Sequence, residues 1–366
     1  MFAEPAPGKT PAASNDAIEL NNRGVRAAET GNFEEAISLV RQALNRAPDD
    51  QQFRKNLSAM LTQWANTREE QGRIDEAKDA LQEAGELEPT NWQALARLGE
   101  LRYVTQGDLG LVLDAWKRAY AHMPTAQRDV VAKRIAQAER DQTIERTFSS
   151  HGTAHFAIRF DSPQHAPDAE SVGEALEQAY GAIKQRMGAG PSQVHVILYS
   201  GSDFQRVSGR RDWAVGLYDG RIRLRLEEAQ SPFAPQLVAH ELAHAFLATG
   251  YGPRLPTWVH EGFAQSQEPE GPQNQRYETL LPGLTSRTAW IPLKWLDRRF
   301  AQPSNLEDVE RAYAQSRYVV DRLIKQHGMD RFQNFLSQLK SGRSVDAACE
   351  SAFSIRWARL DQGLFE

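Results

Sequence analysis

The sequence predicts an α-helical repeat solenoid followed by an α+β domain. Three observations lead to this fold class: an internal repeat over residues 17–124, alternating apolar residues between about 150 and 230, and a later apolar helix with two histidines one turn apart. The chain has 366 residues, 40% of them hydrophobic, which is enough for two or three domains with real cores. We expect a disordered Pro/Ala-rich tail at 1–15, repeats with a capping helix at 16–148, and a second domain at 149–366.

The first half of the chain contains a repeated pattern. Gly31–Ala36 recurs as Gly72–Ala77, and a proline follows each alanine twelve residues later. These copies, and a more diverged third copy, fit a 34-residue frame that resembles tetratricopeptide repeats, in which each repeat is a pair of antiparallel helices. The first two copies are offset by 41 residues, so the first helix of the second copy is expected to be two turns longer. The residues that fit the frame are Gly24, Ala36, Ala43 and Pro48; Leu61, Trp64, Ala77, Leu81, Ala84 and Pro89; and Trp92, Leu95, Leu98, Gly99, Ala119 and Pro124.

The resemblance to tetratricopeptide repeats implies a concave helical surface that binds peptides or protein partners. The alternative is that the repeats pack as a scaffold for the following domain. The sequence names no partner, and the charged residues of the repeats are interpreted as solvated helix faces. A helix at Ala126–Phe148 is expected to cap the stack.

The segment from about 150 to 230 has the period of strands. Apolar residues alternate over 156–160 and 194–198, and an amphipathic helix is expected between them, over 172–187. A hairpin is expected from Trp213–Leu217 and Arg221–Leu226, joined by a two-residue Asp-Gly turn. The arginines of its second strand alternate with apolar core residues. We interpret them as the solvated side chains of an edge strand, whose charges prevent pairing with another chain. The alternative is that they contact acidic side chains of a substrate.

A metal site is the sharpest signal in the sequence. His240 and His244 are spaced i and i+4, so on a helix both imidazoles face one ion, while Glu241 can reach a water beside it. Glu261 is the best-placed carboxylate downstream, on a helix expected to begin with Thr257 as its N-cap. Two imidazoles, one carboxylate and an open position are typical of catalytic zinc. The alternative is a buried helix whose polar residues are only hydrogen-bonded core residues.

The HExxH motif at 240–244 and the segment Pro256–Ala264 together resemble the gluzincins, in particular the peptidase MA-like domains of bacterial proteins. In that family a P-x-W-x-x-E-G-x-A segment carries the glutamate ligand. The likeness runs from about residue 150 to the C-terminus, through Thr153–Ile158, Leu217–Ile222 and Ala312–Ser316. It implies a thermolysin-like fold and zinc-dependent peptide hydrolysis.

Each site residue has an expected role under this resemblance. It implies that His240, His244 and Glu261 bind Zn²⁺ and that Glu241 is the general base. Tyr313, in the helix after the ligands, is the leading candidate for stabilising the oxyanion, with Tyr218 and Tyr251 as weaker ones. The neighbouring His260 is rotated by about 100° around the helix axis from Glu261. It is therefore expected to form part of the wall of the site or to pack in the core, and not to bind the metal.

Two features depart from relatives. Thermolysin-like members carry an acidic residue four positions after the glutamate ligand, where this chain has Gln265. The G-x-M-E-N exopeptidase motif is missing from the sequence, which favours an endopeptidase.

Composition narrows the remaining classes. The net charge of −5 argues against nucleic-acid binding. No stretch reaches eighteen apolar residues, so no membrane span is expected. The single Cys349 excludes a zinc site built from cysteine thiolates. The expected partners are therefore a peptide or protein substrate and a possible protein on the repeats. Two alternatives remain open: an interaction protein with an inactive zinc domain, or a zinc amidase or esterase. The compartment is periplasmic if a signal peptide has been removed, and otherwise cytoplasmic.

Overall fold

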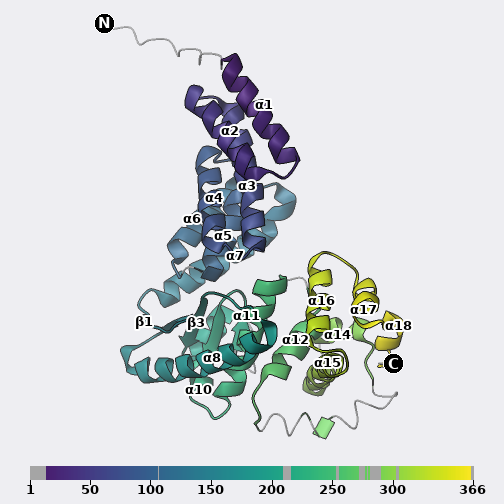
Figure 1. The fold of residues 1–366 in the computed structure, drawn as a ribbon. Coiled ribbons are helices and arrows are strands. Elements are labelled where there is room, and N and C mark those ends of the chain that lie inside the picture. Colours follow the sequence, from purple (N-terminus) through teal and green to yellow (C-terminus); the bar gives the residue numbers. More distant parts are fainter. Residues whose placement is uncertain are drawn as a thin grey trace. The chain divides into compact units, whose positions relative to one another are not determined.

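The chain divides into two compact units. The computed structural model describes residues 14–105, 107–208, 216–252, 255–271, 277, 279–280, 290–301 and 305–363. By its internal contacts the chain splits into Met1–Thr143 and Ile144–Glu366. Figure 1 shows a helical first unit, and a second unit that combines a small sheet with many helices. The predicted fold class is confirmed at this level. Residues 1–13 of the expected tail lie outside the described residues, and the first helix begins at Asn15.

The first unit consists of three helical hairpins followed by one further helix. Short connections make each pair antiparallel, and polar side chains at Ser14, Asn32, Asp50 and Asp108 cap the helices that follow them. The helices are α1 (Asn15–Glu29), α2 (Phe33–Arg46), α3 (Gln51–Glu70), α4 (Ile74–Leu87), α5 (Trp92–Thr105), α6 (Leu109–His122) and α7 (Thr125–Glu145).

Small residues allow these helices to pack closely. The alanines of the repeat frame, such as Ala36, Ala77 and Ala119, are 0% exposed. The ring of Trp116 lies where a side chain on Gly99 would be. Helix α3 has 20 residues and α1 has 15, so the second copy is longer as predicted, by five residues rather than two full turns.

A five-stranded sheet forms the centre of the first part of the second unit. The strand order is β1 (Ser149–Gly152), β2 (Phe156–Phe160), β3 (Val194–Tyr199), β5 (Ile222–Arg225) and β4 (Gly216–Tyr218). Strands β2, β3 and β5 run parallel, while β1 and β4 pair antiparallel with their neighbours. In the hairpin, Tyr218 pairs with Ile222, so three residues form the turn instead of the predicted two. Residues 213–215 of the expected first strand lie outside the described residues.

Helices cover one face of the sheet. The apolar side chains of β3 and β5, including Val196, Leu198 and Leu224, share a core with α8 (Ala166–Met187) and α11 (Ala234–Tyr251). Short elements complete this part: η1 (Pro163–His165), α9 (Gly201–Ser208) and α10 (Leu226–Ala229).

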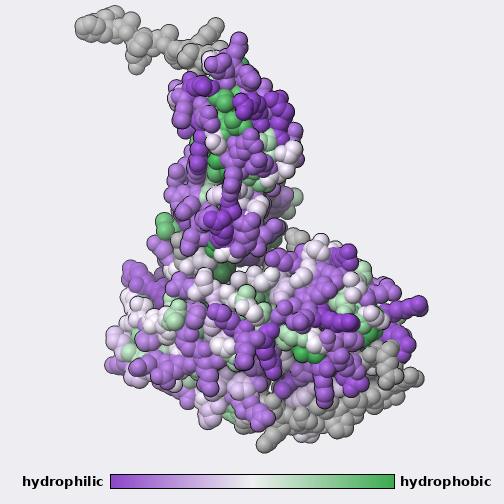
Figure 2. Space-filling view, viewed as in Figure 1, coloured by the Kyte–Doolittle hydropathy of each residue, from purple (hydrophilic) through white to green (hydrophobic). Residues whose placement is uncertain are grey.

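The remaining helices follow in the order α12 (Thr257–Gln267), α14 (Leu293–Ala301), α15 (Leu306–His327), α16 (Met329–Lys340), α17 (Val345–Phe353) and α18 (Trp357–Leu360). Gly328, with φ of +84°, separates α15 from α16 at the predicted stop. None of the described helices is both long and apolar enough to cross a membrane. The face seen in Figure 2 is mostly hydrophilic on both units.

A buried ion-pair network occupies the opposite face of the sheet. Arg221 donates two hydrogen bonds to Glu145, at 3.0 Å and 2.6 Å, and Tyr199 donates a third at 2.6 Å. Arg223 donates to the hydroxyl of Tyr199 and to Asp219. Burial raises the pKa of Glu145, but the charge of Arg221 outweighs it, and the net shift is downward.

This network corrects the interpretation of the arginines in the hairpin. Arg221 is 1% and Arg223 0% exposed, so neither lies on a solvated edge or contacts a substrate. The reason is that Arg223 lies on β5, an interior strand between β3 and β4, and that Arg221, in the turn just before β5, packs on Glu145. The predicted alternation itself is confirmed, because Ile222 and Leu224 are 0% exposed on the other face.

Loss of Arg221 should destabilise the second unit strongly. Arg221→Met leaves the carboxylate of Glu145 buried with fewer partners, which costs about 3–5 kcal/mol for a buried pair. Urea denaturation measures this loss. The control is Arg206→Met, which breaks the Arg206–Asp203 ion pair, where the arginine side chain is 70% exposed. A change of less than about 1 kcal/mol is expected there, and equal effects of the two substitutions would contradict the structural role of Arg221.

Candidate metal centre

Helix α11 presents two imidazoles on one face. Its apolar residues Leu242, Ala243 and Leu247 are 0% exposed, so the helix is held in the core. His240 and His244 are one turn apart, and their ring centroids are separated by 4.9 Å. Both side chains are largely buried, with 16% and 13% of their surface exposed. The helix therefore fixes the two rings on the same side.

Helix α12 brings a carboxylate to these rings. A side chain on Gly262 would overlap the backbone carbonyl of Ser316 in α15, so the glycine allows the two helices to touch. The expected N-cap is wrong: Pro256 occupies that position without a side-chain cap. Instead Asp297, from α14, accepts a hydrogen bond from the backbone N–H of Trp258 at 3.2 Å. Both contacts fix Glu261 on the second turn of α12.

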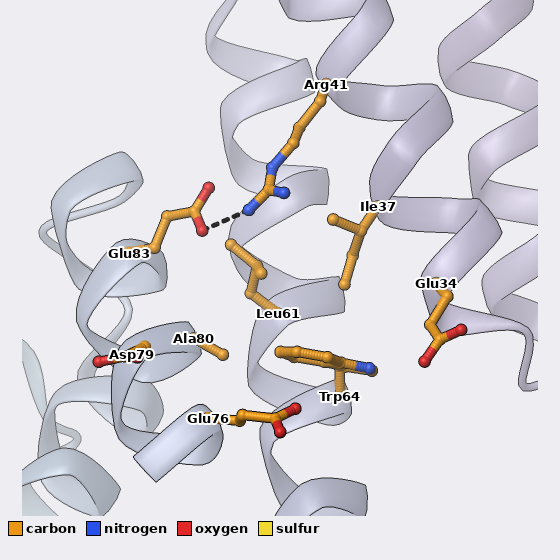
Figure 3. Close-up of a pocket in the computed structure, with 9 residues that line it drawn as sticks. All are labelled: Glu34, Ile37, Arg41, Leu61, Trp64, Glu76, Asp79, Ala80 and Glu83. Carbon is orange, nitrogen blue, oxygen red and sulfur yellow. Dashed lines mark hydrogen bonds and ion pairs between the residues drawn. The ribbon is translucent and has the colours of Figure 1, made fainter.

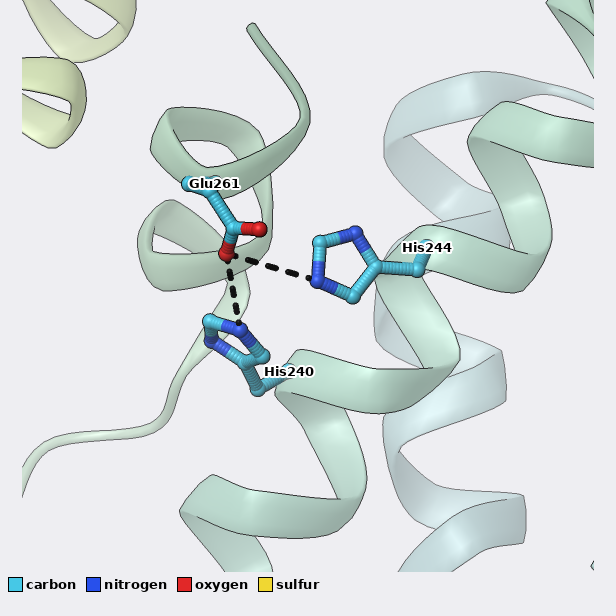
Figure 4. Close-up of side chains that lie close together, drawn as sticks. All are labelled: His240, His244 and Glu261. Carbon is cyan, nitrogen blue, oxygen red and sulfur yellow. Dashed lines mark ion pairs between the residues drawn. The ribbon is translucent and has the colours of Figure 1, made fainter. Parts of the chain in front are cut away.

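The three side chains converge on one point. Oε2 of Glu261 lies 3.4 Å from Nε2 of His240 and 3.6 Å from Nε2 of His244. Figure 4 shows this oxygen between the two rings. One ligand atom from each residue lies within 4.8 Å of the others, and this is the group in the described part of the chain that could hold a metal ion. The sequence therefore identified all three members of the group.

The environment of Glu261 suits a cation. Its Oε2 is buried and has no hydrogen-bond partner within the described residues. Burial raises the pKa of Glu261, but His244 and His240 outweigh it and hold the pKa far below its usual range. Burial lowers the pKa of His240, but the neighbouring carboxylates of Glu261 and Glu268 raise it well above the usual value. The carboxylate is therefore stabilised by positive charge from the imidazole side, which is where a metal cation would sit.

Glu268 is a site residue that the sequence reasoning missed. Its Oε1 lies 2.8 Å from Nδ1 of His240, the ring nitrogen that faces away from Glu261. A carboxylate in this position orients a metal-binding histidine and sets its tautomer. Glu268 lies seven residues after Glu261, at the C-cap of α12. In thermolysin-like relatives an acidic residue lies four positions after the glutamate ligand, where this chain has Gln265. Here Glu268 is the acidic neighbour instead.

Glu241 lies against the edge strand of the sheet. The side chain is 6% exposed. A Cβ on Gly216 of β4 would be only 2.7 Å from Oε1 of Glu241, so the carboxylate occupies the space that this glycine leaves. The base candidate is thus next to β4, which pairs with β5 at the end of the strand order.

Among the tyrosine candidates, Tyr313 has a described ring contact with His240. The ring centroid of Tyr313, on α15, lies 6.5 Å from that of His240 and 5.0 Å from that of Phe300. Tyr218 lies on β4 and Tyr251 at the end of α11, and the described ring contacts place neither of them on a ligand. The ring of His260 lies 5.7 Å from that of His244.

His260 is a neutral neighbour rather than a member of the ligand group. Burial and the charge of His244 lower its pKa to about 4, against an opposing effect of Glu261. It is not part of the three-residue group found among the described residues, which agrees with a wall or core position.

Comparison with known proteins bears on this part of the chain. Residues 192–364 match the family model of the Peptidase MA superfamily. The C-terminal unit carries a Peptidase MA region. This match covers the three convergent side chains, Glu241 and Tyr313, and it indicates metallopeptidase-type hydrolysis as the class of reaction.

The other comparisons add little. No curated protein matches the sequence. Among solved structures, the chain is similar to the first tetratricopeptide repeat domain of Spaghetti (RPAP3) bound to the HSP90 peptide SRMEEVD, at 15% identity and a TM-score of 0.26. The alignment covers 37% of this chain and 99% of that chain.

Adding one methyl group at Gly262 should destabilise the Peptidase MA region. Gly262→Ala forces α12 away from Ser316, and overpacking of this kind costs roughly 1–3 kcal/mol. The control is Gly250→Ala in α11, where a Cβ would meet nothing within 4 Å. That substitution should be neutral or slightly stabilising in a helix. Urea denaturation of both variants tests the contact, and a Gly262→Ala protein as stable as the parent would contradict it.

Proposed function

We propose that the C-terminal unit is a zinc-dependent endopeptidase and that His240, His244 and Glu261 hold the metal. The observation that carries this proposal is the buried Oε2 of Glu261, which lies between two imidazole nitrogens without a hydrogen-bond partner among the described residues. Two imidazoles and one carboxylate are a typical donor set for catalytic zinc. The Peptidase MA match over the same residues supports a peptidase as the reaction class.

Glu241 is the proposed general base. A bound zinc ion supplies Lewis acidity, which acidifies water and polarises a carbonyl group. On the helix that carries both histidines, the carboxylate of Glu241 accepts the proton of the attacking water and delivers it to the leaving amine. Its position beside Gly216 supports a proton transfer next to the edge strand β4, where an extended peptide backbone can pair with the sheet.

Tyr313 is the proposed donor to the developing oxyanion. The ring contact between Tyr313 and His240, with 6.5 Å between the ring centroids, supports this choice. A phenol stays protonated at neutral pH and can donate a hydrogen bond where negative charge develops. Phe300 packs against the ring and holds its orientation.

The ligand and base roles give distinct results on substitution. His240→Ala, His244→Ala and Glu261→Ala should each remove the metal, because each deletes one of three ligands. Glu241→Gln should keep the metal and lose nearly all hydrolysis, because this side chain acts on the water. Metal analysis of the purified proteins, together with cleavage of a mixed peptide library with and without chelator, measures both properties. Metal loss in Glu241→Gln, or retention in Glu261→Ala, would overturn the assignment.

Removal of one hydroxyl tests Tyr313. Tyr313→Phe keeps the ring packing and should lower kcat by roughly ten- to a thousandfold, the loss expected for one oxyanion donor, with KM and metal content little changed. Tyr251→Phe serves as the matched control and should stay near the parent. If kcat of Tyr313→Phe remains within about twofold of the parent while Tyr218→Phe falls, the donor is Tyr218.

Neutralising Glu268 should weaken the metal site without deleting a ligand. Glu268→Gln loses the carboxylate that holds Nδ1 of His240, and such changes weaken metal binding by about 10- to 100-fold. Competition with a chromogenic chelator measures the affinity. Glu270→Gln, an exposed residue two positions away, is the control and should bind as the parent does. Equal affinities of the two variants would rule out the orienting role.

We propose further that the two halves have separate tasks, with repeats over 16–148 that recruit a protein partner or substrate and a catalytic domain over 149–366. The stack of helical hairpins in the first unit supports this division. The ligands and Glu241 all lie beyond residue 239, in the second unit.

A further inference from the structure

Three helices of the first unit surround a pocket. It has a volume of about 360 Å³ and is lined by one face each of α2, α3 and α4. This volume is at the lower end of the range for ligand pockets, about 300–1,000 Å³, and it holds a long side chain with part of its backbone. The lining residues are Glu34, Ile37, Arg41, Leu61, Trp64, Glu76, Asp79, Ala80 and Glu83 (Figure 3).

The floor of the pocket is apolar and well ordered by packing. Ile37, Leu61 and Ala80 are 6%, 1% and 2% exposed. Figure 3 shows the indole of Trp64 lying below Leu61 and above Glu76. The guanidinium of Arg68 lies 4.6 Å from the centre of that indole, which holds the ring in place. A floor of this kind suits the methylene chain of a long side chain.

The rim of the pocket is acidic. Its lining residues include four carboxylates and a single guanidinium, that of Arg41. Glu83 pairs with Arg41 at 2.6 Å, Glu34 pairs with Arg68, and Glu76 pairs with Arg68 and Arg73. Asp79 is the exception, because it forms no hydrogen bond or ion pair with any residue that the structure describes.

We propose that this pocket binds a lysine or arginine side chain of a peptide segment in a partner or substrate protein. The inference rests on the proposed recruiting role of the repeats and names the chemistry that they recognise. The methylene chain of the basic residue packs on Trp64 and Leu61, and its cationic group pairs with Asp79 at the rim. Charge complementarity decides between occupants. An acidic segment would face the unpaired carboxylate of Asp79, and a purely apolar segment would cover that carboxylate without giving it a partner.

Selection from a random peptide library tests the proposal. The full chain with Glu241→Gln is immobilised, so that no peptide is cleaved, and the retained peptides are sequenced. Relative to the input, the retained pool should be enriched in lysine and arginine over aspartate and glutamate. The readout is binding alone, so a failure of the proposed hydrolysis leaves the result intact.

Two charge-reversal variants separate the pocket from the net charge of the protein. Asp79→Lys places a cation in the pocket, and Asp129→Lys makes the same change at an exposed position on α7 outside the lining. The enrichment should persist with Asp129→Lys and disappear with Asp79→Lys. The milder Asp79→Asn should reduce it by roughly two- to fivefold, as expected for one partly exposed charge pair.

Three results would overturn the proposal. These are a retained pool without basic enrichment, enrichment that survives Asp79→Lys, and enrichment lost equally with Asp129→Lys. Circular dichroism of each variant confirms that the helices are intact, which is expected because both substituted residues are exposed.

Discussion

The contact between the backbones of α12 and α15 at Gly262 and Ser316 is the constraint on which the candidate site depends. A helix pair can approach this closely only where one member lacks a side chain. Glu261 is adjacent to the glycine, and Tyr313 is one turn before the serine on α15. The same contact therefore places a ligand from one helix and the proposed donor from the other near the histidines of α11.

The sheet is held by a different kind of interaction. Glu145, at the end of α7, pairs with Arg159 of β2, Tyr199 of β3 and Arg221 of the turn before β5, on the face opposite the apolar core. Charges buried to this degree are stable only when each has partners with good geometry. Because Arg221 and Arg223 flank Ile222, the network also fixes the hairpin whose other strand, β4, lies next to Glu241.

Local patterns in the sequence predicted most of the elements and the three side chains that converge at the candidate site. The i, i+4 spacing of His240 and His244 and the alternation in β2, β3 and β5 are properties of single elements, so they can be read without a fold. The contacts that side chains make with residues from distant segments could not be predicted in this way. Glu268 reaches His240 only because of the angle between α11 and α12, and Asp297 caps α12 from 39 residues away. The burial of Arg221 depends on Glu145, 76 residues earlier in the chain.

Helix α12 has a consequence for how the centre assembles. This short helix carries Glu261 and has Glu268 as its C-cap, so the two carboxylates that contact His240 move together. If α12 shifts as a body, both ring nitrogens of His240 lose their carboxylate neighbours together, whereas fraying at its C-terminal end releases only Nδ1. The arrangement of these three side chains is therefore tied to the packing of a single helix.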